Sequence, residues 1–329
     1  MSTLLSVLSK TEGAEAAHLR EFAAAVRSGL TRPGQKELHS KYFYDELGSA
    51  LFEAITVLPE YGLSRADLRI LASNADEIAV RAGSPVLVAE LGSGTGRKTR
   101  YLLEAFGRRQ LSLRYCPIDV SVAALETCER LLDGVAEVYP LPGTYLPGVT
   151  QAARMLRPGE RLMLLFLGST IGNFEPAPAM AFLRDLRREI QAGDHLLLGA
   201  DLVKPVEQLL LAYNDPAGVT AAFNLNLLGR INRELGANFD LRRFRHDSRY
   251  NALYQRVEMH LVSTAAQTVE IPMAGCRVPF AEGESIWTES SHKYRLSDLD
   301  RMATESGFRV EAQWTDAEWP LVESLWIAI

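Results

Sequence analysis

Short apolar runs alternate with amphipathic stretches along the middle of the chain. The runs at 86–91, 113–118 and 161–167 are each long enough for one strand, and the stretches between them carry apolar residues at helical spacing. Alternation of strands with helices is typical of a parallel sheet with helices on its faces. The pattern therefore predicts a doubly wound α/β fold that begins near Ser64.

The same reading assigns the remaining elements. We expect helices at 64–81, 97–106, 121–132 and 177–190, and strands at 86–91, 113–118, 135–139, 161–167 and 195–202. After residue 202 the alternation stops for roughly ninety residues, far longer than the usual connection in an α/β unit. An amphipathic helix at 297–306 and two strands, 308–314 and 321–328, then end the chain, and the two strands are close enough in sequence to pair as a hairpin.

Two segments lie outside this alternation. Apolar residues recur at helical spacing over 15–26, and a break at 31–34 precedes a second segment at 41–55. No flexible linker or repeat separates these segments from the rest. We therefore expect a discontinuous substrate-binding domain, a cofactor-binding domain that carries the sheet, and an active site between them. The expected bounds are 1–66 with 203–293 for the first domain, and 67–202 with 294–329 for the second.

A glycine-rich segment follows the strand expected at 86–91. Its three alternating glycines are Gly92, Gly94 and Gly96. Glycine lets the backbone turn sharply and approach a ligand closely, and the N-terminus of the helix that follows would attract an anionic group. Asp119, at the end of the next strand, can accept hydrogen bonds from both hydroxyls of a ribose. These features predict a cofactor that contains a nucleoside.

The spacing of the glycines separates two classes of cofactor. In the fingerprint Gly-x-Gly-x-x-Gly of dinucleotide-binding proteins the third glycine allows close helix packing, and here that position is Arg97. Nicotinamide and flavin dinucleotides are therefore disfavoured. Glu90 before the first glycine, together with Gly96, is typical of the first motif of S-adenosylmethionine-dependent methyltransferases.

Composition and charge exclude several other classes. The net charge of −6 at pH 7 gives no basic surface for a nucleic acid. Three cysteines are an odd, sparse set that predicts reduced thiols in a cytoplasmic protein, and we expect neither a signal peptide nor a membrane span. The six histidines show no metal-ligand spacing, so no metal is expected.

Motifs outside the glycine segment point to one family. They are Phe43-Tyr44-Asp45, Pro59-Glu60-Tyr61, the run 168–173 (Gly-Ser-Thr-Ile-Gly-Asn) and Thr288-Glu289-Ser290-Ser291. In their joint occurrence the chain resembles the L-histidine Nα-methyltransferases of ergothioneine biosynthesis, from about residue 15 to the C-terminus. The resemblance implies a Rossmann-like class I methyltransferase sheet with a C-terminal antiparallel hairpin, and S-adenosylmethionine as the cofactor. We expect a monomer.

The resemblance assigns roles residue by residue. Cofactor-binding residues would be Tyr44, Gly92, Gly94, Gly96, Lys98, Asp119, Thr144 and Tyr145, with Lys98 near the methionyl carboxylate. Substrate-binding residues would be Phe52, Tyr61, Asn173, Tyr213, Met259, Glu289 and Ser291, with Asn173 and Tyr213 on the substrate carboxylate. The chain departs from bacterial members of the family at Gly143-Thr144-Tyr145, where those members often have Gly-Asp-Phe. A backbone carbonyl or the Thr144 hydroxyl would then have to replace the carboxylate that binds the adenine amine.

The polar residues of the expected pocket favour histidine as the methyl acceptor. A neutral imidazole offers one hydrogen-bond donor and one acceptor, which the Glu289 carboxylate and the Ser291 hydroxyl can serve. These residues are two apart on an extended segment and would point to the same side. An indole lacks the acceptor and would leave a polar group unpaired. An enzyme that methylates another amino acid or an indole amine such as tryptophan remains the alternative, and a non-catalytic S-adenosylmethionine sensor is a reading from a different class.

The expected reaction needs alignment more than acid or base catalysis. Methyl transfer from a sulfonium is an in-line displacement of an already activated group by a neutral amine. We expect Tyr44 to be the catalytic residue that mediates loss of the ammonium proton, and Tyr44 and Phe52 to face the growing positive charge. The expected product is hercynine, formed through mono- and dimethylhistidine.

Overall fold

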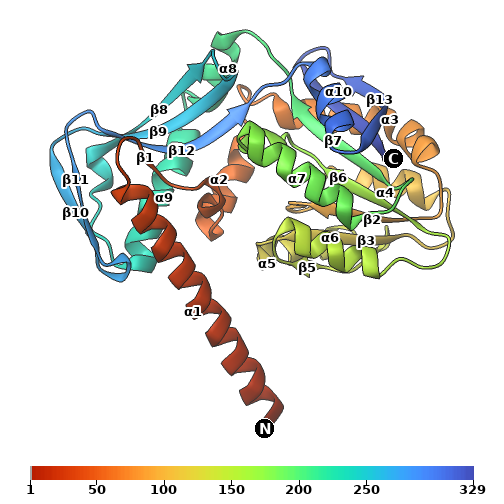
Figure 1. Cartoon of the computed structure of the whole chain (residues 1–329), viewed down its shortest axis with the longest axis horizontal. Coiled ribbons are helices and arrows are strands. Elements are labelled where there is room, and N and C mark those ends of the chain that lie inside the picture. The colour runs from red at the N-terminus through yellow and green to blue at the C-terminus, as the bar shows by residue number, and fades with distance from the viewer. Residues whose placement is uncertain (1) are drawn as a thin grey trace. The chain divides into compact units, whose positions relative to one another are not determined.

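The computed structural model describes residues 2–329, with side chains described for residues 16, 17 and 19–329. These residues form two compact units (Figure 1). Unit 1 comprises Met1–Ile55, Leu209–Asn251 and Val257–Glu289, and unit 2 comprises Thr56–Gln208, Ala252–Arg256 and Ser290–Ile329. Residues 56–66, 203–208, 252–256 and 290–293, which were expected in the first domain, are thus grouped with unit 2. The helix that starts at Leu63 packs on the large sheet of that unit.

Unit 2 is built on an eight-stranded sheet. Its path is β13-β14-β7-β6-β2-β3-β4, with β5 paired to β3. The strands are β2 (Val86–Leu91), β3 (Arg114–Asp119), β4 (Glu137–Val138), β5 (Leu141–Pro142), β6 (Arg161–Phe166), β7 (His195–Asp201), β13 (Phe308–Thr315) and β14 (Leu321–Ala328). Strands β2 to β7 pair in parallel, whereas β14 is antiparallel to both β7 and β13. The predicted parallel sheet and C-terminal hairpin are confirmed.

Helices cover both faces of this sheet (Figure 1). They are α3 (Leu63–Ala82), α4 (Arg100–Gly107), α5 (Val122–Leu131), α6 (Tyr145–Arg154), α7 (Pro176–Glu189) and α10 (Leu296–Glu305). Alternate residues of β2 belong to different cores: Val86 and Val88 pack with α3 and α4, while Leu87 and Ala89 pack with α6 and α7. Because β2 is buried on both faces, its sequence is apolar throughout except for Glu90.

Two expected elements differ in the structure. Helix α4 begins at Arg100 rather than at residue 97, because the turn that carries the three glycines continues through Thr99. The strand expected at 135–139 is reduced to β4, which is two residues long. Pro140 has no N–H to donate, so pairing with β3 is interrupted there and resumes at β5.

Unit 1 contains a smaller sheet, a hairpin and helices. The sheet order is β1-β12-β9-β8, formed by β1 (Lys36–Glu37), β12 (Ser285–His292), β9 (Arg256–Ser263) and β8 (Phe244–Asn251). The hairpin joins β10 (Gln267–Ile271) to β11 (Cys276–Phe280). The helices are α1 (Ser2–Thr31), η1 (Ser40–Phe43), α2 (Glu46–Thr56), α8 (Val206–Tyr213), α9 (Val219–Leu235), η3 (Leu241–Arg243) and η4 (Pro272–Ala274). Elements α2, α8, β9 and β12 each have residues in both units.

A search of residues 2–329 finds no helix with both the length and the apolar character needed to cross a bilayer.

The start of α3 allows a direct test of packing in unit 2. A Cβ atom on Gly62, which has an ordinary φ of −73°, would lie 2.2 Å from the indole of Trp319. Gly62→Ala should lower the free energy of unfolding by about 1–3 kcal/mol through overpacking. The control is Gly107→Ala at the end of α4, where a Cβ meets nothing within 4 Å and should be neutral or stabilise by up to about 1 kcal/mol. Chemical denaturation measures both, and equal effects would contradict this packing.

Candidate functional site

The glycine turn after β2 is tied to the loop after β3. Gly92, Gly94 and Gly96 all have positive φ, at 69°, 52° and 67°. The Gly92 amide donates to the carbonyl of Ile118 at 2.8 Å. The carboxylate of Asp119 accepts the Gly94 amide on one oxygen and the Ser121 amide on the other, both at 2.9 Å. Asp119 therefore fixes the conformation of both loops at the carboxyl edge of the sheet.

The three glycines differ in how closely other atoms surround them. A Cβ on Gly96 would lie 2.6 Å from the thiol sulfur of Cys128, so this position is packed against α5. A Cβ on Gly94 would meet nothing within 4 Å. The turn is therefore anchored at Gly96 and open at Gly94, which leaves room for a ligand above the backbone.

A buried carboxyl lies beneath this turn. The Glu90 side chain accepts hydrogen bonds from the Thr99 hydroxyl at 2.6 Å and from the Tyr115 hydroxyl. Burial raises the pKa of Glu90 to about 7, although Lys98 and the two hydrogen bonds oppose that rise. Because Thr99 immediately precedes α4, the Glu90 contact joins the end of β2 to the start of the following helix.

Lys98 brings a positive charge to the same edge. Its ammonium lies 2.5 Å from the carboxylate of Asp67 on α3, and its side chain is 30% exposed while Asp67 is fully buried. Burial alone would lower the pKa of Lys98, but the charges of Asp67 and Glu90 outweigh burial and the pKa is raised. The ammonium would lie 3.1 Å from a Cβ on Gly168, which follows β6. Lys98 thus stands between the loops that follow β2 and β6.

The loop after β6 is held by contacts on both sides. Ser169 adopts a left-handed conformation, φ 59°, and its hydroxyl accepts the Asp201 amide at 2.9 Å. A Cβ on Gly172 would lie 2.9 Å from the carbonyl of His292, so the two segments approach closely. Asn173 ends the 3-10 turn η2 (Thr170–Asn173) with its side chain half-buried.

Ser291 is held by a buried network of charges that the sequence alone does not reveal. The Lys293 ammonium donates to the Ser291 hydroxyl at 2.8 Å and pairs with Asp201 at 3.0 Å. Asp201 also accepts from Lys204 and from the indole of Trp319. Burial would raise the pKa of Asp201, but the two lysine charges outweigh burial and lower it. The only sequence signal was a charged residue at the end of an otherwise apolar strand.

Tyr145 and Thr144 begin helix α6. The ring of Tyr145 packs between Phe166 and Phe182, with centroid separations of 5.4 and 5.9 Å. Burial raises the pKa of Tyr145 to about 12. Its hydroxyl would lie 3.4 Å from a Cβ on Gly92, so it borders the glycine turn. Thr144 is the exposed N-cap residue of α6, and its side chain makes no capping hydrogen bond.

Unit 1 holds an aromatic cluster that consists of Tyr44, Phe52 and Phe223. The ring of Tyr44 contacts Phe52 edge-on at 5.6 Å and Phe223 at 5.9 Å. The next residue, Asp45, accepts from the Asn226 amide at 2.7 Å and from the Gly48 backbone at 2.7 Å. These bonds fix the turn that presents Tyr44.

Three further predicted site residues also belong to unit 1. Met259 is buried on β9, where its carbonyl accepts the Thr288 hydroxyl of β12 at 3.0 Å. Glu289 is half-buried on β12, and the Tyr213 carbonyl accepts from His246 at 2.8 Å. Tyr61, by contrast, is buried in unit 2.

The edge of the large sheet thus combines four chemical elements: an open turn with backbone amides, a carboxylate suited to a ribose, a lysine suited to a carboxylate, and an acidic network behind the lysine. This set fits a nucleoside that carries an amino-acid end.

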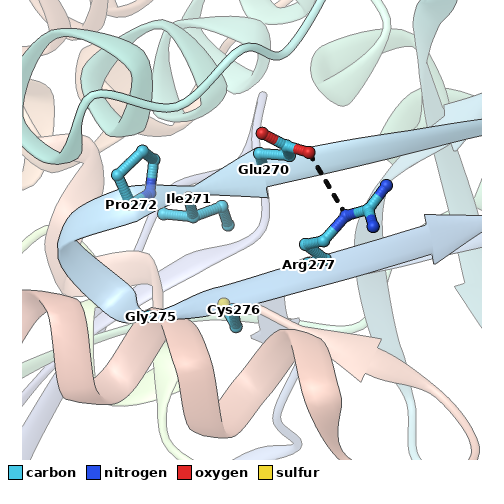
Figure 2. A pocket seen from close by; sticks show the side chains of 6 residues that line it. All are labelled: Glu270, Ile271, Pro272, Gly275, Cys276 and Arg277. Carbon is cyan, nitrogen blue, oxygen red and sulfur yellow. Dashed lines mark ion pairs between the residues drawn. The ribbon is translucent and has the colours of Figure 1, made fainter.

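Figure 2 shows a different pocket, at the turn of the β10–β11 hairpin, where Glu270 pairs with Arg277 at 3.2 Å. None of the residues expected to bind cofactor or substrate lines that pocket. Among the side chains that the structure describes, no group of three His, Cys, Asp or Glu could hold a metal ion.

Comparison with known proteins gives consistent matches. A family model described as "Histidine-specific methyltransferase, SAM-dependent" matches residues 22–326. The chain is 44% identical to the histidine N-alpha-methyltransferase of Mycolicibacterium smegmatis, over 88% of this chain and 90% of that protein. It is 41% identical to the protein of the same name from Mycobacterium tuberculosis, over 92% and 94%. Ergothioneine biosynthesis protein 1 of Schizosaccharomyces pombe is 34% identical over 66% of this chain and 29% of that protein.

The raised pKa of Glu90 predicts a specific dependence of stability on pH. Its folded-state pKa of about 7 lies above the ordinary value of 4.5, so the stability that the protonated carboxyl contributes is complete below about 4.5. That contribution is lost as the pH rises through 7. Glu90→Gln keeps an oxygen that can accept from Thr99 and Tyr115 and cannot ionise. Its free energy of unfolding relative to the unaltered protein should therefore rise by about 1–3 kcal/mol between about pH 5 and about pH 8.

Chemical denaturation across that pH range measures the difference. Glu104→Gln, which alters a half-exposed carboxylate on α4, is the control and should show no such trend. If the free energies of unfolding of Glu90→Gln and the unaltered protein differ by the same amount at every pH, the pKa of Glu90 is not raised in the folded protein.

Proposed function

Because this chain belongs to the family of histidine-specific, S-adenosylmethionine-dependent methyltransferases, we propose that it methylates the α-amino group of L-histidine. Three successive transfers through mono- and dimethylhistidine would give hercynine, the betaine of ergothioneine biosynthesis. The observation that carries the proposal within the structure is the arrangement of Asp119, Lys98 and the open glycine turn at one sheet edge.

The residues at this edge suit the separate parts of the cofactor. Asp119 would bind the ribose hydroxyls, and Lys98 with the amides of the glycine turn would bind the methionyl carboxylate. Tyr145 and Thr144 would border the adenine, and a backbone carbonyl or the Thr144 hydroxyl would accept from the adenine amine. S-adenosylmethionine supplies a methyl group on a sulfonium, which is already activated for transfer. The protein's own contribution is to hold the acceptor amine in line with it.

We propose that the substrate residues are Phe52, Tyr61, Asn173, Tyr213, Met259, Glu289 and Ser291. Asn173 and Tyr213 would bind the carboxylate of histidine. Glu289 would accept from one ring nitrogen and Ser291 would donate to the other, which matches the donor and acceptor of a neutral imidazole.

The Lys293 network supports this role of Ser291. An ammonium that donates to the Ser291 oxygen occupies one lone pair and repels a second proton donor, so the hydroxyl is presented as a donor. Its preferred partner is then a ring nitrogen without a proton. An indole has no such nitrogen, which favours histidine over tryptophan, the acceptor of the alternative reading.

The aromatic cluster suits the later methylation steps. Each transfer enlarges the amine, and the final product carries a permanent positive charge. The faces of Tyr44 and Phe52 can accommodate this charge through cation–π attraction. Tyr44 would also relay the ammonium proton to solvent before each attack.

Mass spectrometry of a competition reaction tests the function. Purified protein is incubated with S-adenosylmethionine and an equimolar mixture of the twenty amino acids. We expect histidine alone to gain one to three methyl groups. A methylated tryptophan would move the assignment to the indole alternative, and tight cofactor binding without turnover on any amine would indicate a sensor.

Replacement of Lys293 tests the presentation of Ser291. Lys293→Met removes the donor to the hydroxyl and should raise the KM for histidine by about tenfold or more, because a charge-assisted hydrogen bond is lost. The KM for S-adenosylmethionine should change by less than about threefold. Lys293→Arg keeps a charged donor and is the matched control, and thermal melts confirm that both variants fold. Equal changes in both KM values would show that Lys293 has only a structural role.

A further inference from the structure

A second buried carboxyl near Lys98 has no role in the function proposed above. Glu323 lies on β14 within an apolar run, opposite Gly199 of β7, and its side chain is fully buried. Neither carboxylate oxygen receives a hydrogen bond from any residue that the structure describes. A Cβ on Gly199 would lie 2.6 Å from one of these oxygens, so the carboxyl is packed tightly against the neighbouring strand.

Asp67 on α3 is a second buried carboxylate with an oxygen that receives no hydrogen bond from a described residue. Asp67 is fully buried, and one of its oxygens binds Lys98 while the other receives no hydrogen bond. Helix α3, which carries Asp67, packs directly on β14, which carries Glu323, and Asp67 raises the pKa of the Glu323 carboxyl through both its charge and its side-chain interaction. Two ionised carboxylates can only accept, so a bond between them requires one proton. Side by side in a buried site, two like charges cannot both persist without a large cost.

We propose that the buried Glu323 carboxyl is protonated and donates a hydrogen bond to Asp67, and that this proton keeps Lys98 able to bind the carboxylate of the cofactor. The proposal rests on the assignment of Lys98 to that carboxylate. Asp67 and Lys98 then form a neutral pair, beside which an anionic group can bind. Loss of the proton would leave this trio with a net negative charge and repel the ligand. Glu323 is therefore a positioning residue that acts through Asp67 and Lys98.

The groups that face Glu323 agree with this reading. Asp67 on α3 opposes ionisation of Glu323, and so does Glu90 on β2 once that carboxyl is ionised, while Lys98 favours ionisation. Burial is the largest effect, and together these influences raise the pKa of Glu323 well above its ordinary value. Because the pKa of Glu323 is raised, its carboxyl keeps the proton at a pH where an ordinary glutamate has lost it, and a further rise in pH removes it.

Ligand binding across pH separates this role from a merely structural one. The Kd of S-adenosylhomocysteine, which has the carboxylate, is measured by calorimetry against that of methylthioadenosine, which lacks it. Between about pH 7 and about pH 9.5 the preference of the unaltered protein for S-adenosylhomocysteine should fall by about tenfold or more. Glu323→Gln, whose amide can donate permanently to Asp67, should lose less than about threefold. Glu318→Gln, at an exposed position near β14, is the control and should behave like the unaltered protein.

Infrared spectroscopy of the unaltered protein supplies a readout that does not depend on any variant folding. A carbonyl stretch of a buried, protonated carboxylic acid should be present at neutral pH, disappear at alkaline pH, and lose the Glu323 component in Glu323→Gln. Absence of this band, or an unchanged alkaline loss of affinity in Glu323→Gln, would overturn the proposal. Failure of the proposed function has a different signature, because the unaltered protein would then show no preference for S-adenosylhomocysteine over methylthioadenosine at neutral pH.

Discussion

The bonds of the Asp119 carboxylate to the Gly94 and Ser121 amides are the constraint on which the cofactor edge depends. They hold the turn after β2 and the loop after β3 in one arrangement. The Gly92 amide also binds the Ile118 carbonyl, but among these contacts only the Asp119 side chain fixes the Gly94 amide in the open part of the turn. The same carboxylate is the group proposed to bind the ribose. In this proposal Asp119 both fixes the two loops and binds the ligand.

Two buried ion pairs fix other side chains near the same edge of the sheet. Lys98 with Asp67, and Lys293 with Asp201, are ion pairs in which at least one partner is fully buried. Such pairs contribute little to stability on balance, since desolvation offsets attraction, but they fix geometry because removal of either partner leaves an unpaired charge. In the proposed function each pair stands behind a group that contacts a ligand: Lys98 itself in the first case, and Ser291 in the second.

Much of this organisation could be predicted from the sequence. Apolar runs such as 86–91 identified the strands of the large sheet, and the motifs around Tyr61 and Glu289 identified the family, which the comparisons confirm. The start of α4 was wrong by three residues, since local periodicity does not show how far a glycine turn extends. Asp67 and Glu323 could not be paired from sequence, because their contact joins distant segments. The sequence marked Glu323 only as an acidic residue within the largely apolar strand β14. The residue assignments at the site stay predictions.

A crystal structure of the protein with S-adenosylhomocysteine and L-histidine would show directly which residues bind each group. We expect the methionyl carboxylate to bind Lys98, the ribose hydroxyls to bind Asp119, and an imidazole nitrogen to accept from the Ser291 hydroxyl. A cofactor bound with its carboxylate away from Lys98, or histidine with its ring away from Ser291, would contradict these assignments.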